Sequence, residues 1–410
     1  MRRTFYYGWI VVAVTFALLV SSGVRTAPSV IIVPLEAAFG WSRSEISLAV
    51  AISLFAFGFG GPIGGSLVDR FGPRRVMIGG LTLTLIGLLP LMGMTEQWQL
   101  LIFWGLLVGV GTGIVTNVLG ATVALRWFNR RRGIVVGLFS AAGAAGQLLF
   151  LPLLVGIAST SGWPAVFTAL AVITGIVLIP VTLLMRNRPE DMGLKPLGAA
   201  TAASQAADTR RTSLRDAVRT RDFWLLAGSF FICGYTTNGL IGTHLLPHTL
   251  EHGFVEAEIS WALAFMGMMN IIGTLASGWL SDRYDNRYLL ATYYGFRALS
   301  LAALPFILEM RGMLLFALIY GLDWVATVPP TVNLTANRFG RASLGTIYGW
   351  IFCSHMIGAG IASYAGGLFR DLLGDYHLIF ISAAVLGLVA VGLVLKLGKP
   401  RRALSQTVEA

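Results

Sequence analysis

A short charged string occurs twice in this chain, once in each half. Gly-Ser-Leu-Val-Asp-Arg-Phe-Gly-Pro-Arg-Arg at 65–75 returns as Gly-Trp-Leu-Ser-Asp-Arg-Tyr-Asp-Asn-Arg at 278–287, which is 213 residues later in a chain of 410. Each copy lies between two long apolar stretches. A repeat at this spacing indicates a duplicated architecture, and the apolar flanks indicate a membrane. The repeat therefore predicts two related helical bundles.

The apolar runs are long enough to cross a bilayer. The chain is 56% hydrophobic and 12% charged, whereas about 25% of residues are charged in ordinary soluble domains. A spanning helix needs roughly 20 apolar residues. We expect an all-α membrane protein with twelve transmembrane helices in two pseudo-symmetric six-helix bundles, at about 7–34, 45–68, 76–94, 98–124, 133–158, 163–185, 223–249, 257–281, 288–308, 313–336, 343–369 and 376–397. The first run lacks a small-residue cleavage site and is predicted to be a retained helix.

Charge predicts the orientation. The predicted loops on one side hold most of the arginines, whereas the other side keeps only Arg43, Arg311 and Arg370. By the positive-inside rule, both termini are predicted to be cytoplasmic in a multi-pass protein of the cell inner (plasma) membrane. The net charge of +11 then reflects topology and attraction to the lipid bilayer, and its dispersal over several loops argues against a nucleic-acid partner.

The longest polar stretch separates the two halves. We expect an N-terminal bundle at 1–186, a cytoplasmic linker at 187–221, a C-terminal bundle at 222–398 and a cytoplasmic tail at 399–410. The linker ends in a short amphipathic segment, Ser213 to Arg219, with a serine cap, which is predicted to lie on the inner membrane surface. Cys233 and Cys353 fall inside predicted spans and are expected to be free packing residues. A functional monomer is expected.

The repeated string resembles the signature loop of the major facilitator superfamily, Gly-x-Leu-x-Asp-Arg-x-Gly-x-Arg-Arg, which in that family joins the second and third helices and, in weaker form, the eighth and ninth. The resemblance implies a conformational latch at Gly65, Asp69, Arg70, Gly72, Arg74, Asp282 and Arg283. Asp69 would face the N-terminus of the helix beginning near Ser343, and Asp282 that of the helix beginning near Gly133, where a carboxylate is favourable. The alternative is that Asp-Arg only caps a tight turn, and it weighs more for Asp282, whose copy lacks the second glycine.

Two further stretches resemble the bacterial monocarboxylate porters and the oxalate–formate antiporter-like group. Residues 127–146 hold an aromatic–Phe pair, a basic triplet and a glycine- and alanine-lined helix, and Tyr7-Gly8-Trp9 resembles the start of that family's first helix. Many of these porters hold the substrate carboxylate with an arginine in the eighth helix. Here that helix has no basic residue between Phe265 and Gly273. The substrate class therefore does not follow from the resemblance.

Polar groups inside spans are costly and mark candidate sites. The candidates for substrate binding are Arg25, Asn117, Tyr235, Asn238, His244 and Asn270, on helices that usually surround the cavity in the resembling family. Arg25 either binds an anion or extends to the outer head groups. The uncharged groups either contact substrate or hydrogen-bond a neighbouring helix. His244, at the outer end of its helix, is expected to be a gate or substrate contact.

Histidine spacing gives little support for a metal. His244, His248 and His252 recur at four-residue intervals, but no cysteine or second acidic cluster accompanies them, so no metal is predicted. The candidates for ion coupling are Arg297, Asp323 and His355. Arg297 and Asp323 each lie about ten residues into successive antiparallel helices, so an ion pair at matched depth is expected.

The role of that pair stays open at this point. The repeat places Thr84 and Val110 at the corresponding positions of the first half, so the fold does not require the pair. A structural bridge and a proton-coupling pair are equally compatible with the sequence. His355 is either a proton carrier or a packing histidine.

No catalytic motif is apparent. The chain has no phosphate-binding glycine loop, nucleophile elbow or His-Glu-x-x-His motif. We therefore expect that the protein is not an enzyme, binds no cofactor and does not pump by ATP hydrolysis. We expect a secondary active transporter that moves a small organic anion, by preference a carboxylate, by alternating access with proton coupling. One alternative is efflux of amphipathic or toxic compounds, which the aromatic and methionine-rich helix around Met266 would suit. The other is a non-transporting solute sensor, which would require an appended signalling domain.

Overall fold

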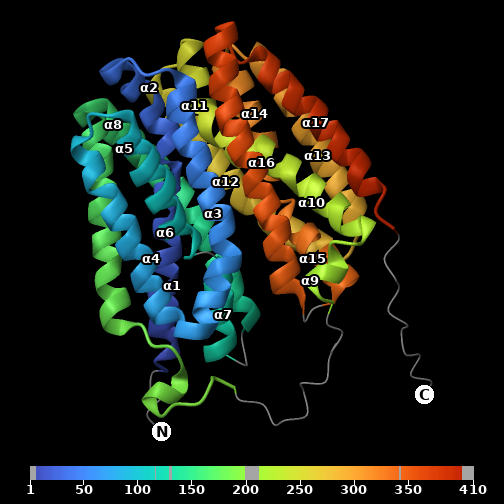
Figure 1. Ribbon diagram of the computed structural model, residues 1–410. Helices are drawn as coiled ribbons and strands as arrows, with labels where there is room; N and C mark the ends of the chain where they lie inside the picture. The colour runs from blue at the N-terminus through green and yellow to red at the C-terminus, as the bar shows by residue number, and fades with distance from the viewer. Residues whose placement is uncertain (1–5, 116, 129–131, 199–211, 341–342, 399–410) are drawn as a thin grey trace.

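The computed structural model describes residues 6–115, 117–128, 132–198, 212–340 and 343–398, although the side chains of some helical residues, Asp69 among them, lie outside the description. The fold is built from helices (Figure 1). They are α1 (Gly8–Ser21), α2 (Ala27–Phe39), α3 (Arg43–Phe71), α4 (Pro73–Leu88), α5 (Gln97–Gln99), α6 (Gly109–Gly113), α7 (Asn117–Trp127), α8 (Arg132–Leu184), α9 (Leu214–Ala217), α10 (Arg221–Gly234), α11 (Gly242–Glu251), α12 (Glu256–Ser281), α13 (Asn286–Ala303), α14 (Met310–Asp323), α15 (Val328–Phe339), α16 (Leu344–Leu373) and α17 (His377–Leu395).

Nine stretches of the described chain are long and apolar enough to cross a bilayer, fewer than the twelve that the sequence predicts. One reason is that α8 covers two predicted spans and is interrupted at Gly162, where φ is 76° and ψ is 178°. A second is that the predicted span at 98–124 is divided among π-helical turns at Leu100–Val108, α6 and α7. A third is α13, which carries Arg287 and Arg297 within 18 residues and is not among the nine.

The helices form two groups that correspond to the two halves of the chain. In Figure 1 the blue-to-green group, α1 to α8, stands beside the yellow-to-red group, α10 to α17. The groups meet through α3 with α16, α8 with α12, and α2 with α11. Their ribbons lie close at the upper end and separate toward the lower end, where α1 begins. We call the lower end the inner face and the upper end the outer face.

Glycines allow α3 and α16 to cross closely. A Cβ atom at Gly58 would lie 2.6 Å from the Cβ of Met356, and one at Gly360 would lie 2.6 Å from the ring of Phe55. Small residues at a helix crossing let the two backbones approach, which is the usual way helices pack in membranes. The α3–α16 crossing is therefore the central contact between the halves.

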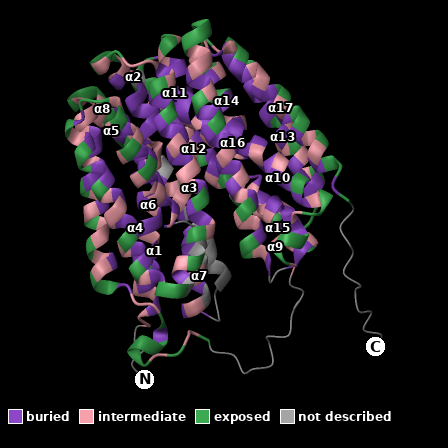
Figure 2. Cartoon of the chain, viewed as in Figure 1, coloured by how far each residue is buried: buried purple, intermediate pink, exposed green. Residues whose placement is uncertain are grey.

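Large apolar side chains face outward from both groups. Ile176, Leu183 and Leu275 are 60%, 63% and 69% exposed, and Figure 2 shows buried residues on the inward sides of the helices. Such exposure would be unfavourable over this much surface in water but is ordinary against lipid tails. The burial pattern therefore agrees with a membrane protein.

The linker segment packs on the second half of the chain. Ser213 Oγ accepts a hydrogen bond from the Asp216 nitrogen (3.1 Å), so the predicted serine cap is present at the start of α9. Ala217 is fully buried in the apolar cluster around α10. Just before α9, the Thr212 nitrogen donates to Ser343 Oγ at the start of α16 (2.7 Å). The segment therefore packs against the second half of the chain, and its place on the inner membrane surface stays a prediction.

Candidate functional site

The helices of the two halves are interrupted at matching places. A 3₁₀ segment, Ser22–Thr26, separates α1 from α2, and π-helical turns, Tyr235–Ile241, separate α10 from α11; the two segments begin 213 residues apart. Interruptions also separate α6 from α7 and α14 from α15. Interrupted segments at corresponding positions of two repeats point to a binding site near the middle of the membrane. Arg25 and Asn238, themselves 213 residues apart, occupy matching positions in the first pair.

Two successive prolines explain the break between α14 and α15. Pro329 and Pro330 have no N–H group, so neither can donate to the carbonyl four residues earlier. The carbonyl of Ala326, which Pro330 leaves without its helical donor, accepts a hydrogen bond of 2.5 Å from Ser277 Oγ on α12. Carbonyl groups at the end of α14 are bound by Arg297.

Arg297 and Asp323 form the ion pair that their matched depths predict. Arg297 Nε donates to Asp323 Oδ2 (2.6 Å), and Nη2 donates to the carbonyl oxygens of Asp323 (2.9 Å) and Trp324 (3.3 Å). Its Nη1 contacts Cys233 Sγ (3.0 Å) and Thr236 Oγ1 (3.4 Å). One buried guanidinium therefore joins α13 to the end of α14, to the end of α10 and to the π-helical turns that follow α10. Asp323 Oδ1 is buried without a hydrogen-bond partner in the described part of the chain.

Arg25 is held between helices of the first half. Its Nη1 donates to Thr112 Oγ1 on α6 (2.9 Å), and its guanidinium carbon lies 3.9 Å from the ring centre of Phe57 on α3. The Thr112 hydroxyl donates in turn to the Val108 carbonyl (2.7 Å). These contacts direct the guanidinium into the bundle rather than toward the outer head groups. Within the described residues, Arg25 has no carboxylate partner.

Aromatic rings connect the Arg25 site to the second half. Phe57 meets Phe352 on α16 edge to face, with ring centres 6.1 Å apart. Phe352 stacks on His355 (5.7 Å, 7°), and His355 also contacts Phe230 on α10 (4.6 Å). His355 is buried, and its Nδ1 has no hydrogen-bond partner among the residues described. Arg25 and His355 therefore lie at opposite ends of one aromatic series across the α3–α16 crossing.

The uncharged candidates differ in their surroundings. Asn238 is half-buried, and its side chain makes no hydrogen bond to the described residues. Tyr235 is buried in the π-helical turns. Asn270 is also buried, but its Oδ1 accepts from Thr274 on the same helix (3.3 Å), a contact that reduces its capacity for a ligand. The side chain of Asn117 lies outside the described residues.

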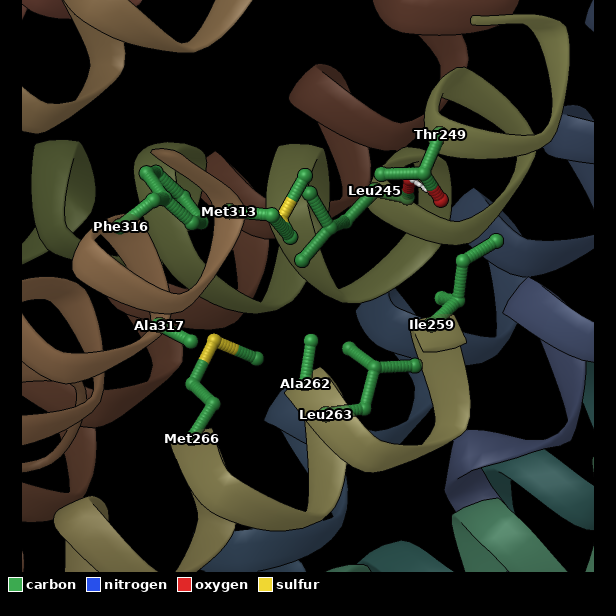
Figure 3. A pocket seen from close by; sticks show the side chains of 9 residues that line it. All are labelled: Leu245, Thr249, Ile259, Ala262, Leu263, Met266, Met313, Phe316 and Ala317. Carbon is green, nitrogen blue, oxygen red and sulfur yellow. Dashed lines mark hydrogen bonds between the residues drawn. The ribbon is translucent and has the colours of Figure 1, made fainter. Parts of the chain in front are cut away.

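An apolar pocket in the second half is separate from this site. Figure 3 shows Leu245, Thr249, Ile259, Ala262, Leu263, Met266, Met313, Phe316 and Ala317 around it. Its one hydroxyl, on Thr249, donates to the Leu245 carbonyl (3.0 Å), so nothing in the lining can neutralise an anion. Met266 packs here against α14, and Met268 is 45% exposed on the outward side of α12. These methionines therefore do not gather around Arg25.

His244 lies toward the outer face, away from Arg25. Its Nε2 is 2.7 Å from the Ser363 carbonyl, and its Nδ1 is 3.2 Å from the Tyr376 hydroxyl. His248 and His252 follow on the same helix, with ring centres 4.2 Å apart. The described residues contain no group of three or more His, Cys, Asp or Glu side chains that could hold a metal ion.

The two charged hairpins contact their own halves. At Gly72 φ is 81°, and a Cβ there would lie 2.5 Å from Asn187 Oδ1, so only glycine fits. Asn187 Oδ1 accepts from the Arg74 nitrogen (3.0 Å), and Arg74 Nη2 donates to the Thr182 carbonyl (2.7 Å). Arg70 is exposed beside Phe71. These contacts fasten the first hairpin to the end of α8; the side chains of Gly65 and Asp69 lie outside the description.

The second hairpin is fastened differently. Asp285 stands where the first copy has Gly72; it caps α13 by accepting from the Arg287 nitrogen (3.0 Å) and pairs with the Arg287 guanidinium (2.6 Å). That guanidinium lowers the pKa of the Asp285 carboxyl. Asp282 and Arg283 are both exposed, and Arg283 lies over Trp279. The latch assigned to these residues therefore stays a prediction about a conformation closed at the inner face.

Sequence reasoning missed Phe57 and Thr112, the partners of Arg25, and Phe352, which contacts Phe57. Thr112 could have been noticed as a polar residue about one turn before Asn117. No signal in the sequence distinguishes Phe57 or Phe352 from the other phenylalanines in the spans, because their importance comes from the crossing of α3 with α16.

Comparison with known proteins agrees with this architecture. The family model of the Major Facilitator Superfamily matches residues 14–363 and 249–409. The uncharacterized MFS-type transporter YcxA of Bacillus subtilis is 28% identical over 399 residues, 95% of each chain. The oxalate:formate antiporter of Oxalobacter formigenes is 25% identical over 407 residues, 97% of this chain and 93% of its own. Monocarboxylate transporter 13 of Bos taurus is 25% identical over 395 residues, 95% of this chain and 89% of its own. The similarity extends over both halves.

Proposed function

The chain belongs to the Major Facilitator Superfamily, and we propose that it is a secondary active transporter of a small organic anion, with a carboxylate as the preferred class. It is a membrane transporter and not an enzyme, because the family and the relatives that match it are transporters. Two relatives are named for oxalate, formate or monocarboxylates, which supports an anionic substrate.

Arg25 is the observation that carries this proposal. In the middle of the spans, the described residues include two arginines, Arg25 and Arg297, and Arg297 is neutralised by Asp323. A guanidinium among helices without a carboxylate is unfavourable, and a substrate carboxylate would compensate it. The planar guanidinium also suits a carboxylate geometrically, since two parallel hydrogen bonds can form. One uncompensated charge favours a singly charged anion.

We infer a rocking cycle between two six-helix bundles, twelve spans in all. The matched interruptions of the two halves support this symmetry, and the arginine-rich loops support inner-membrane insertion with both termini, the linker at 187–221 and the tail in the cytoplasm. We assign proton coupling to His355, whose Nδ1 is free in the described structure, and give Arg297 and Asp323 the structural role that their contacts with α14 support. The transporter acts as a monomer in this proposal.

Reconstituted liposomes test the substrate site. Because a charge-assisted hydrogen bond contributes about 1.5–3 kcal/mol, Arg25→Gln should raise the apparent KM for carboxylates by about 10- to 100-fold. Arg25→Lys keeps the charge and should lie between Arg25→Gln and the parent. Uptake is measured across a panel of mono- and dicarboxylates. Reduced expression with an unchanged KM in the surviving protein would assign Arg25 to folding instead.

The same liposomes test coupling at His355. With His355→Gln, exchange of substrate across the membrane should continue, while accumulation driven by a proton gradient should be lost. Cys353→Ser on the same helix is the control, since that thiol lies two residues away and is free. Equal gradient dependence in the parent and in His355→Gln would remove His355 from coupling.

A further inference from the structure

A dense network of charges joins the two halves at the outer face. Arg43, the first residue of α3, pairs through Nε with Glu36 Oε1 (2.6 Å) in its own half, and its Nη2 also bonds to Glu36. Its Nη1 reaches the other half, where it donates to Glu251 Oε1 (2.5 Å) and to the Tyr376 hydroxyl (2.7 Å). Arg370 pairs with the same Glu251 (3.0 Å). The side chain of Arg43 is 6% exposed, so these bonds are largely shielded from water.

Asp371 adds a second kind of contact between the halves. Its two carboxylate oxygens accept hydrogen bonds from the backbone nitrogens of Arg43 (3.1 Å) and Ser44 (2.8 Å). These nitrogens belong to the first turn of α3, where helical N–H groups lack internal partners and the helix dipole is positive. A carboxylate from the second half therefore caps a helix of the first half.

The network continues inward through Tyr376 to His244. The Ser363 carbonyl can only accept, so His244 Nε2 carries the hydrogen and Nδ1 accepts from the Tyr376 hydroxyl. Burial raises the pKa of that hydroxyl although Arg43 opposes the effect, and the hydroxyl therefore stays protonated and able to donate. His244 thus belongs to the outer network and not to the Arg25 site.

The contact of Asp371 with the start of α3 is equivalent to the contact that we expect of Asp69. The two contacts lie at opposite ends of the α3–α16 pair. Asp371 lies two residues before the end of α16 and caps the start of α3. Asp69 lies two residues before the end of α3 and, by the resemblance above, faces the start of α16. At the start of α16, Ser343 Oγ accepts a hydrogen bond from the Thr212 nitrogen of the linker, and the side chain of Asp69 lies outside the described residues. The two ends of the α3–α16 pair therefore carry equivalent capping positions, and Asp371 fills the outer one.

We propose that Arg43, with Glu36, Glu251, Asp371 and Tyr376, is the outer gate of the transport cycle. The gate closes when Arg43 bridges the carboxylates of both halves and Asp371 caps α3. It opens when these bonds break and the halves pivot at the Gly58–Met356 crossing, which brings Asp69 to the start of α16. This inference rests on the alternating-access part of the proposed function and is independent of the substrate class.

Spin-label distances between the halves test the gate. Ala38→Cys with Leu372→Cys reports the outer face, and Leu184→Cys with Tyr284→Cys reports the inner face; all four positions are exposed. The native Cys233 and Cys353 are buried and remain in place, and the labelled parent protein supplies the background. In Arg43→Gln, a larger fraction of molecules than in the parent should show a longer distance between the outer labels and a shorter distance between the inner labels.

Glu45→Gln is the matched control. Glu45 lies at the same end of α3, but its carboxylate bonds to Ser42 within its own half (2.8 Å), so its removal should leave both distances unchanged. Folded Arg43→Gln protein with the parent's outer distance would overturn the proposal, as would an equal shift in Glu45→Gln. If Arg43→Gln does not fold, Glu251→Gln and Asp371→Asn replace it, because each removes fewer bonds between the halves. Both variants must then shift the same two distances, and unchanged distances would overturn the proposal. A shift in a protein that transports no carboxylate supports the gate and contradicts the substrate assignment alone.

Discussion

At the scale of single residues, the contacts of Arg297 and Asp323 were partly predictable from their positions in the sequence and partly not. The pairing was predictable because an α-helix rises a fixed 1.5 Å per residue, so residues about ten positions into successive antiparallel helices reach similar depths. The binding of two main-chain carbonyls by Arg297 was not predictable, because it depends on where α14 stops. The Arg25–Phe57 contact was likewise hidden, since it depends on how α1, α2 and α3 pack.

The pair itself makes a prediction with a definite order of effects. Neutralising one partner of a buried pair typically costs 3–5 kcal/mol, about the range we expect for Arg297→Gln, which also leaves carbonyls of Asp323 and Trp324 without a donor. Asp323→Asn should cost less, because Arg297 keeps those carbonyls. The double variant should be no less stable than Arg297→Gln alone. Thermal unfolding in detergent measures the order, and costs that simply add would show that the two residues do not interact.

At the scale of helices, the sequence predicts where apolar segments lie better than where they are interrupted. The apolar runs correctly placed helices at nearly every predicted span, since length and hydrophobicity suffice for that decision. The boundary between the predicted spans 133–158 and 163–185 agrees with the interruption of α8 at Gly162, whereas the π-helical turns at Leu100–Val108 and Tyr235–Ile241 were missed. Such features depend on packing against neighbouring helices, to which a hydrophobicity pattern is insensitive. Pro329 and Pro330 were a visible sign of the break between α14 and α15, and Pro28 was one of the break between α1 and α2.

Two glycines of α3 test how closely that helix must approach α16. A Cβ at Gly58 would lie 2.6 Å from Met356, whereas one at Gly61, on the same helix, would meet nothing within 4 Å. Gly58→Ala should therefore lower the free energy of unfolding by about 1–3 kcal/mol through overpacking. Gly61→Ala should be neutral or stabilising by up to about 1 kcal/mol, because alanine favours the helix. Equal melting temperatures for the two variants would contradict the close crossing.

At the scale of the whole molecule, the repeat offset was the most informative part of the sequence. It predicted two related halves, and the matching positions of Arg25 and Asn238 in the interrupted helices follow the same 213-residue offset. The closed outer face was not predictable, because the conformations of such a transporter differ by only a few kcal/mol and share one sequence. Arg43 and Arg370 nevertheless stood out as two of the three arginines that break the charge asymmetry, and both lie in the outer network.

The inner latch can be tested through its competition with the outer gate. If Arg43→Gln releases the outer face, the inner face must then be held by Asp69 at the start of α16, where a carboxylate and a helix N-terminus attract each other by about 0.3–1 kcal/mol or more. Adding Asp69→Asn to Arg43→Gln should therefore return population to the longer inner distance between positions 184 and 284. Asp282→Asn in the same background is the control, because Asp282 is exposed and its copy of the hairpin lacks the second glycine. If Asp69→Asn and Asp282→Asn change the inner distance equally, Asp69 is only a turn residue. Other residues must then hold the inner face closed.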